Sequence, residues 1–332
     1  GRSFAGLWRV VSCTDTSIYD ISDEYLTLAT NIGGTVWYFV NDNSTNGDVY
    51  CTEPGFVTNS GFSPDVPAAS IKSIIDARKL EPGDRIYVDT GIYNLTADIL
   101  LTDLDSGVLT NPVRIIGSYN KAAGGSVLNR QVPGGGTSVI RLDTATGIEL
   151  WDLTLRNAGI GLRVADSTEC RFIGLRSEDH AEAAYSLLRS TSLEFLRCLG
   201  RTSPVGLYTT ESGACLFENG VLWDNPTAAT FLRTGAHRFR NSVLHAAGYN
   251  QRVFNLDALS AVTAIESDYN NIVFEGGALV AEKTQPIGGN DIYPTLTDWQ
   301  RRLGKDLNSL SHAPLFANSV IGNFHELAGS PL

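Results

Sequence analysis

A repeat of 22 or 23 residues runs through the middle of the chain and limits the folds that it can adopt. The centres of successive apolar segments follow one another in steps of 22, 23, 22 and 22 residues, at Leu150, Phe172, Phe195, Phe217 and Phe239. The positions two residues earlier follow the same steps and are mostly apolar. A fixed period of this length is typical of a solenoid, in which each repeat forms one coil and buries its apolar face against its neighbours.

Two solenoid folds use repeats of this length, the parallel β-helix and the leucine-rich repeat. The leucine-rich motif is absent, and one phenylalanine column stands where several leucine columns would be needed. The apolar segments are short and are separated by Gly, Asn, Asp, Ser and Thr, which favours strands over helices. We therefore predict an all-β chain that forms a right-handed parallel β-helix, a single-stranded solenoid.

The period fixes where equivalent side chains should lie. Each coil should stand about 4.8 Å above the previous one, so the phenylalanines should form a buried internal stack. Asn219 and Asn241 should lie at a turn, where their side-chain amides would bond to the next coil. Cys170 and Cys215 are two coils apart, about 10 Å, which exceeds the span of a disulfide. We expect both to be buried free thiols.

The sequence also predicts the burial of one histidine and allows a disulfide between two N-terminal cysteines. His237 shares the inward column with the phenylalanines, so we expect a buried histidine with satisfied hydrogen bonds. Cys13 and Cys51 flank the N-terminal region and would be able to pair in an oxidising compartment.

The repeat divides the chain into three predicted parts. Residues 1–36 form an N-terminal extension or arm, residues 37–290 the β-helix with its N-terminal cap, and residues 291–332 a C-terminal capping segment, because the period fails after about residue 260. Short helices are expected near 68–79 and 295–304. They would cover the ends of the solenoid, where an exposed coil presents an unpaired sheet edge.

Charge and hydropathy exclude several classes of partner. The formal net charge is −11, which repels nucleic acid and anionic membrane surfaces. The sequence has no apolar run near the roughly 20 residues that a membrane span needs, so we expect no membrane span. An acidic polysaccharide would also be repelled, unless a local patch of arginine overrides the overall field.

Several segments resemble the bacterial right-handed parallel β-helix modules, pectin-lyase-like in fold, of secreted or cell-surface proteins. The similar segments are residues 38–43, 47–50, 59–64, 69–71, 80–88, 91–93, 313–316, 323–327 and 329–332. The resemblance implies an extracellular or cell-surface location, and its relatives include pectate-lyase-like enzymes and non-catalytic modules. Such modules usually continue beyond the motif that ends here at Leu332, which implies a longer parent polypeptide.

One column of polar and aromatic residues at the strand ends is the candidate ligand-binding stripe. Sugars bind such stripes by stacking on Trp and by hydrogen bonds to Arg and carboxylate groups. An ordinary solvated stripe is the alternative. With the loop residues beside it, the predicted ligand-binding set is Arg156, Glu178, Asp179, His180, Arg201, Trp223 and His245.

The repeat region gives little support for catalysis. A β-elimination on a uronic acid needs a base, commonly Lys or Arg, and a cation that neutralises the carboxylate. Residues 122–282 contain no Lys, and they show neither clustered Asp ligands for calcium nor neighbouring Asp pairs on consecutive strands. We therefore assign no catalytic residue.

A polar loop supplies the candidate metal ligands. Its side chains offer the hard oxygen atoms that calcium prefers, from Asp42, Asn43, Asn46 and Asp48. The loop lacks the spacing of an EF-hand, and a network of Asx turns explains the same residues without a metal. No other cofactor is expected.

Charges of opposite sign alternate on the outer face of the strands. Glu149, Arg171 and Glu194 fall in one column, and Glu218 and Arg240 in the next. We interpret these as cross-strand pairs that set the register.

The sequence thus favours a non-catalytic extracellular surface or matrix module, structural or carbohydrate-binding, within a larger protein or assembly. Its expected partner is a glycan or a neighbouring protein subunit. One alternative is a polysaccharide lyase or glycoside hydrolase that acts on acidic glycans. Another is a self-assembling filament or lattice subunit, joined end to end or through apolar stretches at 4–11 and 25–29 of the arm.

Overall fold

The structure, a computed structural model, describes residues 34–332 apart from 234, 320–322, 329 and 331–332. For residues 264, 323, 325 and 326 it describes the backbone alone. Before residue 34 it describes four short strands in two antiparallel pairs, β1 (Ser3–Gly6) with β4 (Leu26–Ala29) and β2 (Arg9–Val11) with β3 (Tyr19–Ile21). The rest of the predicted arm, and its role in assembly, lie outside the described residues.

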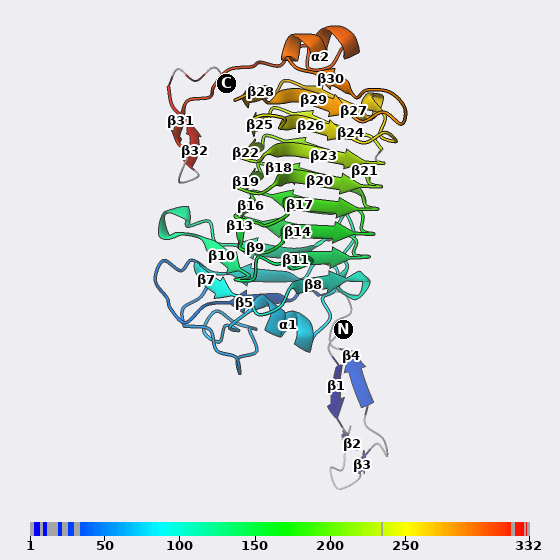
Figure 1. The fold of residues 1–332 in the computed structure, drawn as a ribbon. Helices are drawn as coiled ribbons and strands as arrows, with labels where there is room; N and C mark the ends of the chain where they lie inside the picture. The colour runs from blue at the N-terminus through cyan, green and yellow to red at the C-terminus, as the bar shows by residue number, and fades with distance from the viewer. Residues whose placement is uncertain are drawn as a thin grey trace.

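Three sheets of parallel strands wrap around one core (Figure 1). Sheet 1 has nine strands: β5 (Trp37–Val40), β6 (Arg85–Val88), β9 (Val113–Gly117), β12 (Ile148–Trp151), β15 (Arg171–Ile173), β18 (Thr191–Leu196), β21 (Gly213–Glu218), β24 (His237–Arg240) and β27 (Ile265–Asp268). Sheet 2 has eight: β7 (Gly91–Asn94), β10 (Ser126–Asn129), β13 (Leu153–Arg156), β16 (Arg176–Glu178), β19 (Leu199–Arg201), β22 (Val221–Trp223), β25 (Val243–Ala247) and β28 (Asn271–Glu275). Sheet 3 has nine: β8 (Ile99–Thr102), β11 (Ser138–Asp143), β14 (Ile160–Ala165), β17 (Ala183–Leu188), β20 (Val205–Thr210), β23 (Thr227–Leu232), β26 (Arg252–Leu256), β29 (Leu279–Lys283) and β30 (Asp291–Tyr293), of which β30 is antiparallel.

Apart from the end pairs β5–β6 and β29–β30, each strand pairs within its sheet with the strand three places further along the chain. Each coil therefore contributes one strand to each sheet, and the chain climbs by one strand spacing per coil. This is the predicted right-handed parallel β-helix, in agreement with the right-handed crossover that parallel strands prefer.

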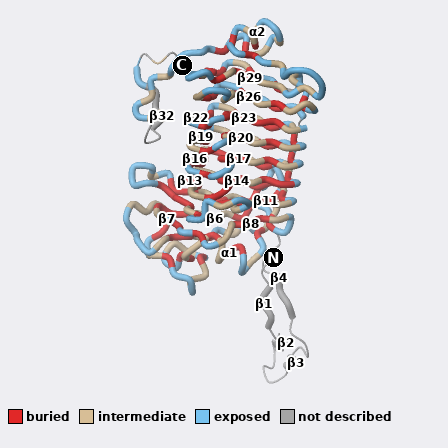
Figure 2. The backbone as a smooth tube through the Cα atoms, in the orientation of Figure 1, coloured by how far each residue is buried: buried red, intermediate tan, exposed pale blue. Residues whose placement is uncertain are grey.

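The internal phenylalanine stack is present. The ring centroids of Phe172 and Phe195 are 4.7 Å apart, those of Phe195 and Phe217 6.2 Å, and those of Phe217 and Phe239 6.0 Å. All four side chains are buried, and Figure 2 shows buried segments recurring in coil after coil. The 22-residue period therefore arises from one interior column of stacked rings.

In the middle coils, the turn between sheet 1 and sheet 2 begins with a residue that has a positive φ. Asn219 (φ 53°) and Asn241 (φ 49°) occupy this position, as predicted. The predicted side-chain bonds to the next coil are wrong, because the backbone N–H of Asn219 donates to the Arg240 carbonyl instead. Amides that do bridge coils stand elsewhere: Asn225 Nδ2 donates to the Gly200 carbonyl at 2.9 Å, and Asn270 Nδ2 to the Phe239 carbonyl at 3.0 Å.

Two short helices lie near the ends of the solenoid, as predicted, although both are shorter than expected. They are α1 (Ile71–Ala77) and α2 (Leu296–Leu303). Trp299 of α2 is fully buried, and its ring lies 5.6 Å from that of Phe254. This contact closes the upper end of the core in Figure 1.

The loss of period after residue 260 does not end the solenoid. His237 of β24 pairs with Ile265 of β27, a step of 28 residues. The longer turn includes the 3₁₀ helix η3 (Val262–Ala264); two others, η1 (Asp103–Asp105) and η2 (Lys121–Ala123), lie in the early coils. Extra residues in the turns hide the repeat while the strands keep their register.

The four cysteines within the described residues are buried free thiols, which confirms the prediction for Cys170 and Cys215. Cys51 is therefore unpaired in this structure, and Cys13 lies outside the described residues. His237 is fully buried, as expected, although among the described residues neither of its ring nitrogens forms a hydrogen bond. Among the described residues, no helix combines the length and apolar character that crossing a membrane requires.

Candidate functional site

The predicted stripe follows one column on the outer face of sheet 2. Arg156, Glu178 and Arg201 are in register on β13, β16 and β19, and Arg201 is in register with Trp223 on β22. The column continues to His245 on β25, whose ring stacks on that of Trp223. Side chains alternate between the two faces of a strand, so these point outward while their neighbours line the core. The structure thus places these five predicted residues side by side.

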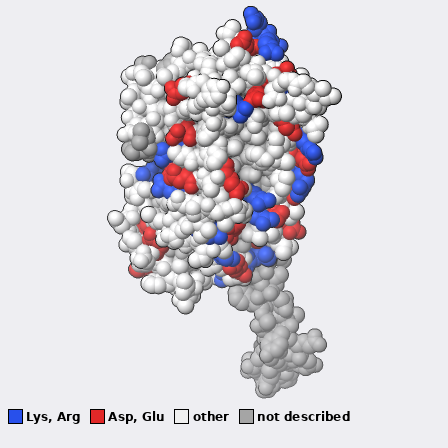
Figure 3. All heavy atoms as spheres, viewed as in Figure 1, with Lys and Arg blue, Asp and Glu red and all other residues white. Residues whose placement is uncertain are grey.

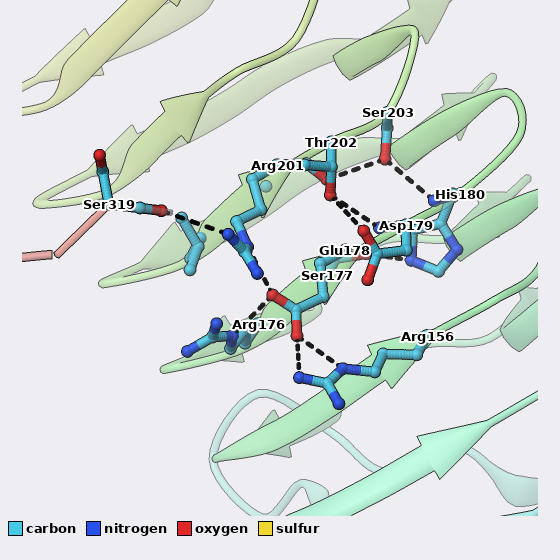
Figure 4. A network of polar contacts seen from close by, with 12 residues as sticks. Arg156, Arg176, Ser177, Glu178, Asp179, His180, Arg201, Thr202, Ser203 and Ser319 are labelled. Atoms are coloured by element: carbon cyan, nitrogen blue, oxygen red, sulfur yellow. Dashed lines mark hydrogen bonds and ion pairs between the residues drawn. The ribbon is translucent and has the colours of Figure 1, made fainter. Parts of the chain in front are cut away.

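Glu178 is the centre of a cluster of three arginines, the Glu178 cluster (Figure 4). Arg156 Nε donates to its Oε1 at 2.6 Å, and Arg156 Nη2 contacts the same oxygen. On the other oxygen, Oε2, Arg176 Nε donates at 2.9 Å and Arg201 Nε at 2.6 Å. One carboxylate therefore fixes three guanidinium groups on three adjacent strands.

The members of the Glu178 cluster differ in how far their side chains are buried. The Glu178 side chain is fully buried, whereas those of Arg156, Arg176 and Arg201 are 38%, 28% and 12% exposed. Burial alone would raise the pKa of Glu178, but the hydrogen bond from Arg201 and the charges of the other two arginines outweigh it and lower the pKa. The expectation of an open stripe is wrong for Glu178, which stays ionised beneath the arginines.

The two loop residues beside the column face different ways. Asp179 is exposed, and its Oδ1 accepts a hydrogen bond of 2.7 Å from Thr202 Oγ1. His180 turns inward, where its Nδ1 accepts from the Ala158 N–H at 3.3 Å and its Nε2 lies 3.0 Å from Ser177 Oγ. Burial lowers the pKa of His180 to about 4. His180 is therefore a neutral, structural histidine, out of reach of a ligand on the outer face.

The upper end of the column is covered by protein. The rings of Trp223 and His245 stack with centroids 4.1 Å apart and an interplanar angle of 15°. Phe316 and Phe324 contact Trp223 edge-on, from the hairpin of β31 (Phe316–Asn318) and β32 (Asn323–Glu326). His245 is 3% exposed. His245 is therefore closed to a sugar, contrary to the expectation, whereas Trp223 is half-buried beside the hairpin and its role in ligand binding stays a prediction.

The same hairpin reaches the Glu178 cluster. Arg201 Nη1 donates to the Ser319 carbonyl at 3.3 Å. His245 Nδ1 accepts from the Asp224 N–H at 3.1 Å, and its Nε2 lies 3.3 Å from Glu275 Oε1. The open part of the column thus lies below the hairpin in Figure 1, at β13 and β16.

Lys121 joins the open part of the column, although the sequence analysis missed it. It lies in η2, one residue before the Lys-free segment 122–282, and its Nζ donates to the Asp152 carbonyl at 2.6 Å. The side chain is 49% exposed. Burial lowers the pKa of Lys121, Asp152 raises it, and the nearby guanidinium of Arg176 lowers it, with a net decrease. No motif signals this residue, since only the fold brings η2 beside Asp152, at the turn between β12 and β13.

The predicted calcium loop is held together by its own hydrogen bonds. Asn41 Nδ2 donates to Asp48 Oδ2 at 2.6 Å, and Asp42 Oδ1 accepts from the Ser44 N–H at 2.8 Å. Burial is the main cause that raises the pKa of Asp48 to about 6. Asn43 and Asn46, the other two predicted ligands, are exposed, and within the described residues no group of three or more His, Cys, Asp or Glu side chains is placed to hold a metal. Calcium binding stays a prediction.

The outer face of sheet 1 carries the predicted charge alternation. Arg171 lies between two acids, with its Nε 2.7 Å from Glu194 Oε2 and its Nη1 3.5 Å from Glu149 Oε1. Arg114 extends the ladder with an Nε–Oε2 distance of 2.7 Å to Glu149. Glu218 and Arg240 are neighbours in register. The ladder from Arg114 to Glu194 thus pairs its own charges on the outer face of sheet 1.

The solved structures that are similar to this chain are distant from it in sequence. No protein-family model matches the chain, and no curated protein matches it significantly. Among solved structures, a pectate lyase is 12% identical over 90% of this chain and 92% of its own, with a TM-score of 0.49. An alginate lyase from a Paenibacillus species (12%, 66% and 93%, 0.41) and a rhamnogalacturonan lyase (15%, 72% and 73%, 0.44) are also similar. Similarity this distant does not carry activity, so function has to be argued from this chain's own residues.

Proposed function

We propose that the chain is an extracellular carbohydrate-binding module, and that the outer face of β13, β16 and β19 binds an acidic glycan. The observation that supports this most is the Glu178 cluster, in which one buried carboxylate orders three arginines on adjacent strands. A guanidinium group binds carboxylates in a planar, two-pronged geometry, and its charge persists at all physiological pH values. Arg156 keeps 38% of its side chain exposed for such a contact.

The local positive charge answers the objection raised by the net charge of −11. Lys121, Arg156, Arg176 and Arg201 belong to neighbouring segments on one side of the solenoid. Glu178 and Asp152, whose Oδ1 lies 3.7 Å from Lys121 Nζ, supply two negative charges among them. At physiological ionic strength charges are screened over about 8 Å. A uronate carboxylate at this face therefore responds to the arginines and the lysine more than to acidic groups on the far side.

Isothermal titration with a galacturonate oligomer tests this proposal. Arg156→Ala should weaken binding by about tenfold, because a charge-assisted hydrogen bond contributes about 1.5 kcal/mol. The matched control is Arg233→Ala, which removes the same charge from the turn after β23, where Arg233 is 62% exposed. Affinity should also fall as salt rises. Equal losses in both variants, or no binding of the oligomer by the native chain, would overturn the proposal.

A lyase that acts on the same glycan is the second candidate, and Lys121 is the observation that favours it. β-Elimination transfers the proton beside the uronate carboxylate to a base, breaks the glycosidic C–O bond and forms a C=C bond, and the leaving oxygen takes a proton from the protonated base or from water. Glu178 and His180 are too deeply buried to serve. Lys121 is half exposed, has a lowered pKa and lies near Arg176, which would neutralise the carboxylate.

The lyase candidate has a direct assay in the ultraviolet absorbance of the new double bond. With polygalacturonate the native chain should produce a rising absorbance, and Lys121→Ala should abolish it while retaining most of the affinity. A flat trace from the native chain excludes the lyase and leaves the binding proposal untouched.

A further inference from the structure

A hollow of about 360 Å³ lies on the outer face of sheet 3, away from the Glu178 cluster. It spans β14, β17 and β20, which face the viewer in Figure 1. Its polar lining comes from Arg163, Glu182, Ser186 and Tyr208, and apolar side chains such as Val205 and Leu188 complete it. The volume lies at the lower end of the range for small-molecule sites.

The register of sheet 3 explains the hollow. Arg163 on β14 is in register with Ser186 on β17, which is in register with Tyr208 on β20. All three point outward from adjacent coils, and the middle one is small. The guanidinium and the phenol ring therefore form two walls about 10 Å apart, two strand spacings, with the serine hydroxyl between them. We call this arrangement the sheet 3 notch.

The polar groups of the notch are available to a ligand. Within the described part of the chain, Arg163 and the Tyr208 hydroxyl make no hydrogen bond or ion pair, unlike most arginines on the coils. Glu182 is exposed, and its Oε1 accepts from the Gly136 N–H at 3.1 Å while Oε2 faces no described donor. The notch thus offers a guanidinium, a hydroxyl and an aromatic ring on three adjacent strands, with Glu182 about 13 Å from Ser186 along the strand direction.

We propose that the sheet 3 notch binds one pyranose ring of a glycan. The apolar face of the ring would contact Tyr208, and its hydroxyls would bond to Ser186 and Arg163. One acidic and one basic side chain balance each other, so recognition rests on hydrogen bonds and ring contact. This distinguishes the notch from the cationic face of sheet 2, and it gives the module a second, charge-independent site. Figure 3, which views this side, shows mostly uncharged atoms with a few scattered charged groups.

Titration with neutral hexasaccharides in high salt tests the notch separately from sheet 2. The probes are cellohexaose, xylohexaose and mannohexaose, added to the full chain by calorimetry. High salt suppresses binding that depends on charge. At least one probe should bind the native chain, and Arg156→Ala on sheet 2 should bind it equally well.

Three variants identify the residues responsible. Ser186→Leu fills the space between the walls, and Tyr208→Ala removes the ring contact; each should weaken binding at least tenfold. Arg163→Ala, which breaks no contact in the described chain, should do the same without affecting folding. The matched control is Thr191→Leu, at an exposed position on sheet 1, and it should have no effect. Failure of all three probes to bind, or unchanged affinity in Arg163→Ala and Ser186→Leu, would overturn the proposal.

Discussion

Replacing Glu178 by glutamine keeps the shape of the side chain and removes the charge that three guanidinium groups share. Removing one partner of a buried ion pair costs about 3–5 kcal/mol, because the remaining charge is left uncompensated. The arginines here are 12–38% exposed, so water can partly solvate them, and the cost should lie near the lower limit. The new amide N–H₂ also faces guanidinium donors, which adds a repulsive contact. We expect Glu178→Gln to lower the free energy of unfolding by about 3 kcal/mol.

Urea unfolding followed by tryptophan fluorescence measures this loss, with Glu194→Gln as the matched control. Glu194 also pairs with an arginine, Arg171, but its side chain is 41% exposed, so its loss should stay below about 1 kcal/mol. The pH dependence supplies a second check. Because the pKa of Glu178 is lowered on folding, its contribution is present above its ordinary pKa of 4.5 and disappears as the pH falls through the lowered value. Equal, small losses in the two variants at pH 7 would refute the role assigned to Glu178.

Two further predictions concern the interior. Phe217→Ala should lower the free energy of unfolding by about 4 kcal/mol, because it opens a cavity in the ring stack. The control Phe56→Ala, at a side chain that is 58% exposed, should change this free energy by less than about 1 kcal/mol. Urea unfolding curves measure both. Burial lowers the pKa of His237 from 6.5 to about 4. Between pH 7 and pH 5 His237 therefore takes up a proton in the unfolded chain but stays neutral in the native chain. Because of this residue, the free energy of unfolding of the native chain should fall by about 2 kcal/mol from pH 7 to pH 5. The same unfolding curves, measured for His237→Leu at both pH values, should lack this decrease.

The sequence predicted the solenoid because the interior demands one kind of side chain at one position in every coil. Where turns carry insertions the signal fails, although the strands remain in register. Val113 pairs with Ile148, a step of 35 residues, and His237 with Ile265, a step of 28. A sequence period requires every coil to have the same number of residues. The fold requires only that the strands stack, so the turns between them can vary in length. The early and late coils were therefore invisible to a search for a fixed repeat.

The sequence predicted which residues of the candidate site align on adjacent strands, but it did not predict which of their side chains are buried. Equal spacing placed Glu178 between Arg156 and Arg201, but the sequence does not indicate that Arg176, two residues before Glu178 on the same strand, closes over it as well. The covering of Trp223 depends on a hairpin about 100 residues further along the chain. His180 turns inward because the preceding residue, Asp179, has a positive φ of 63°. Contacts between distant segments and one backbone angle decided which side chains stay open.

The most direct test of the proposed function is a crystal structure of the chain with a bound galacturonate oligomer. We predict a uronate carboxylate within hydrogen-bonding distance of the Arg156 guanidinium, on the outer face of β13 and β16, with Glu178 still buried beneath. An oligomer bound to another face, with no contact to Arg156 or Arg176, would contradict the account.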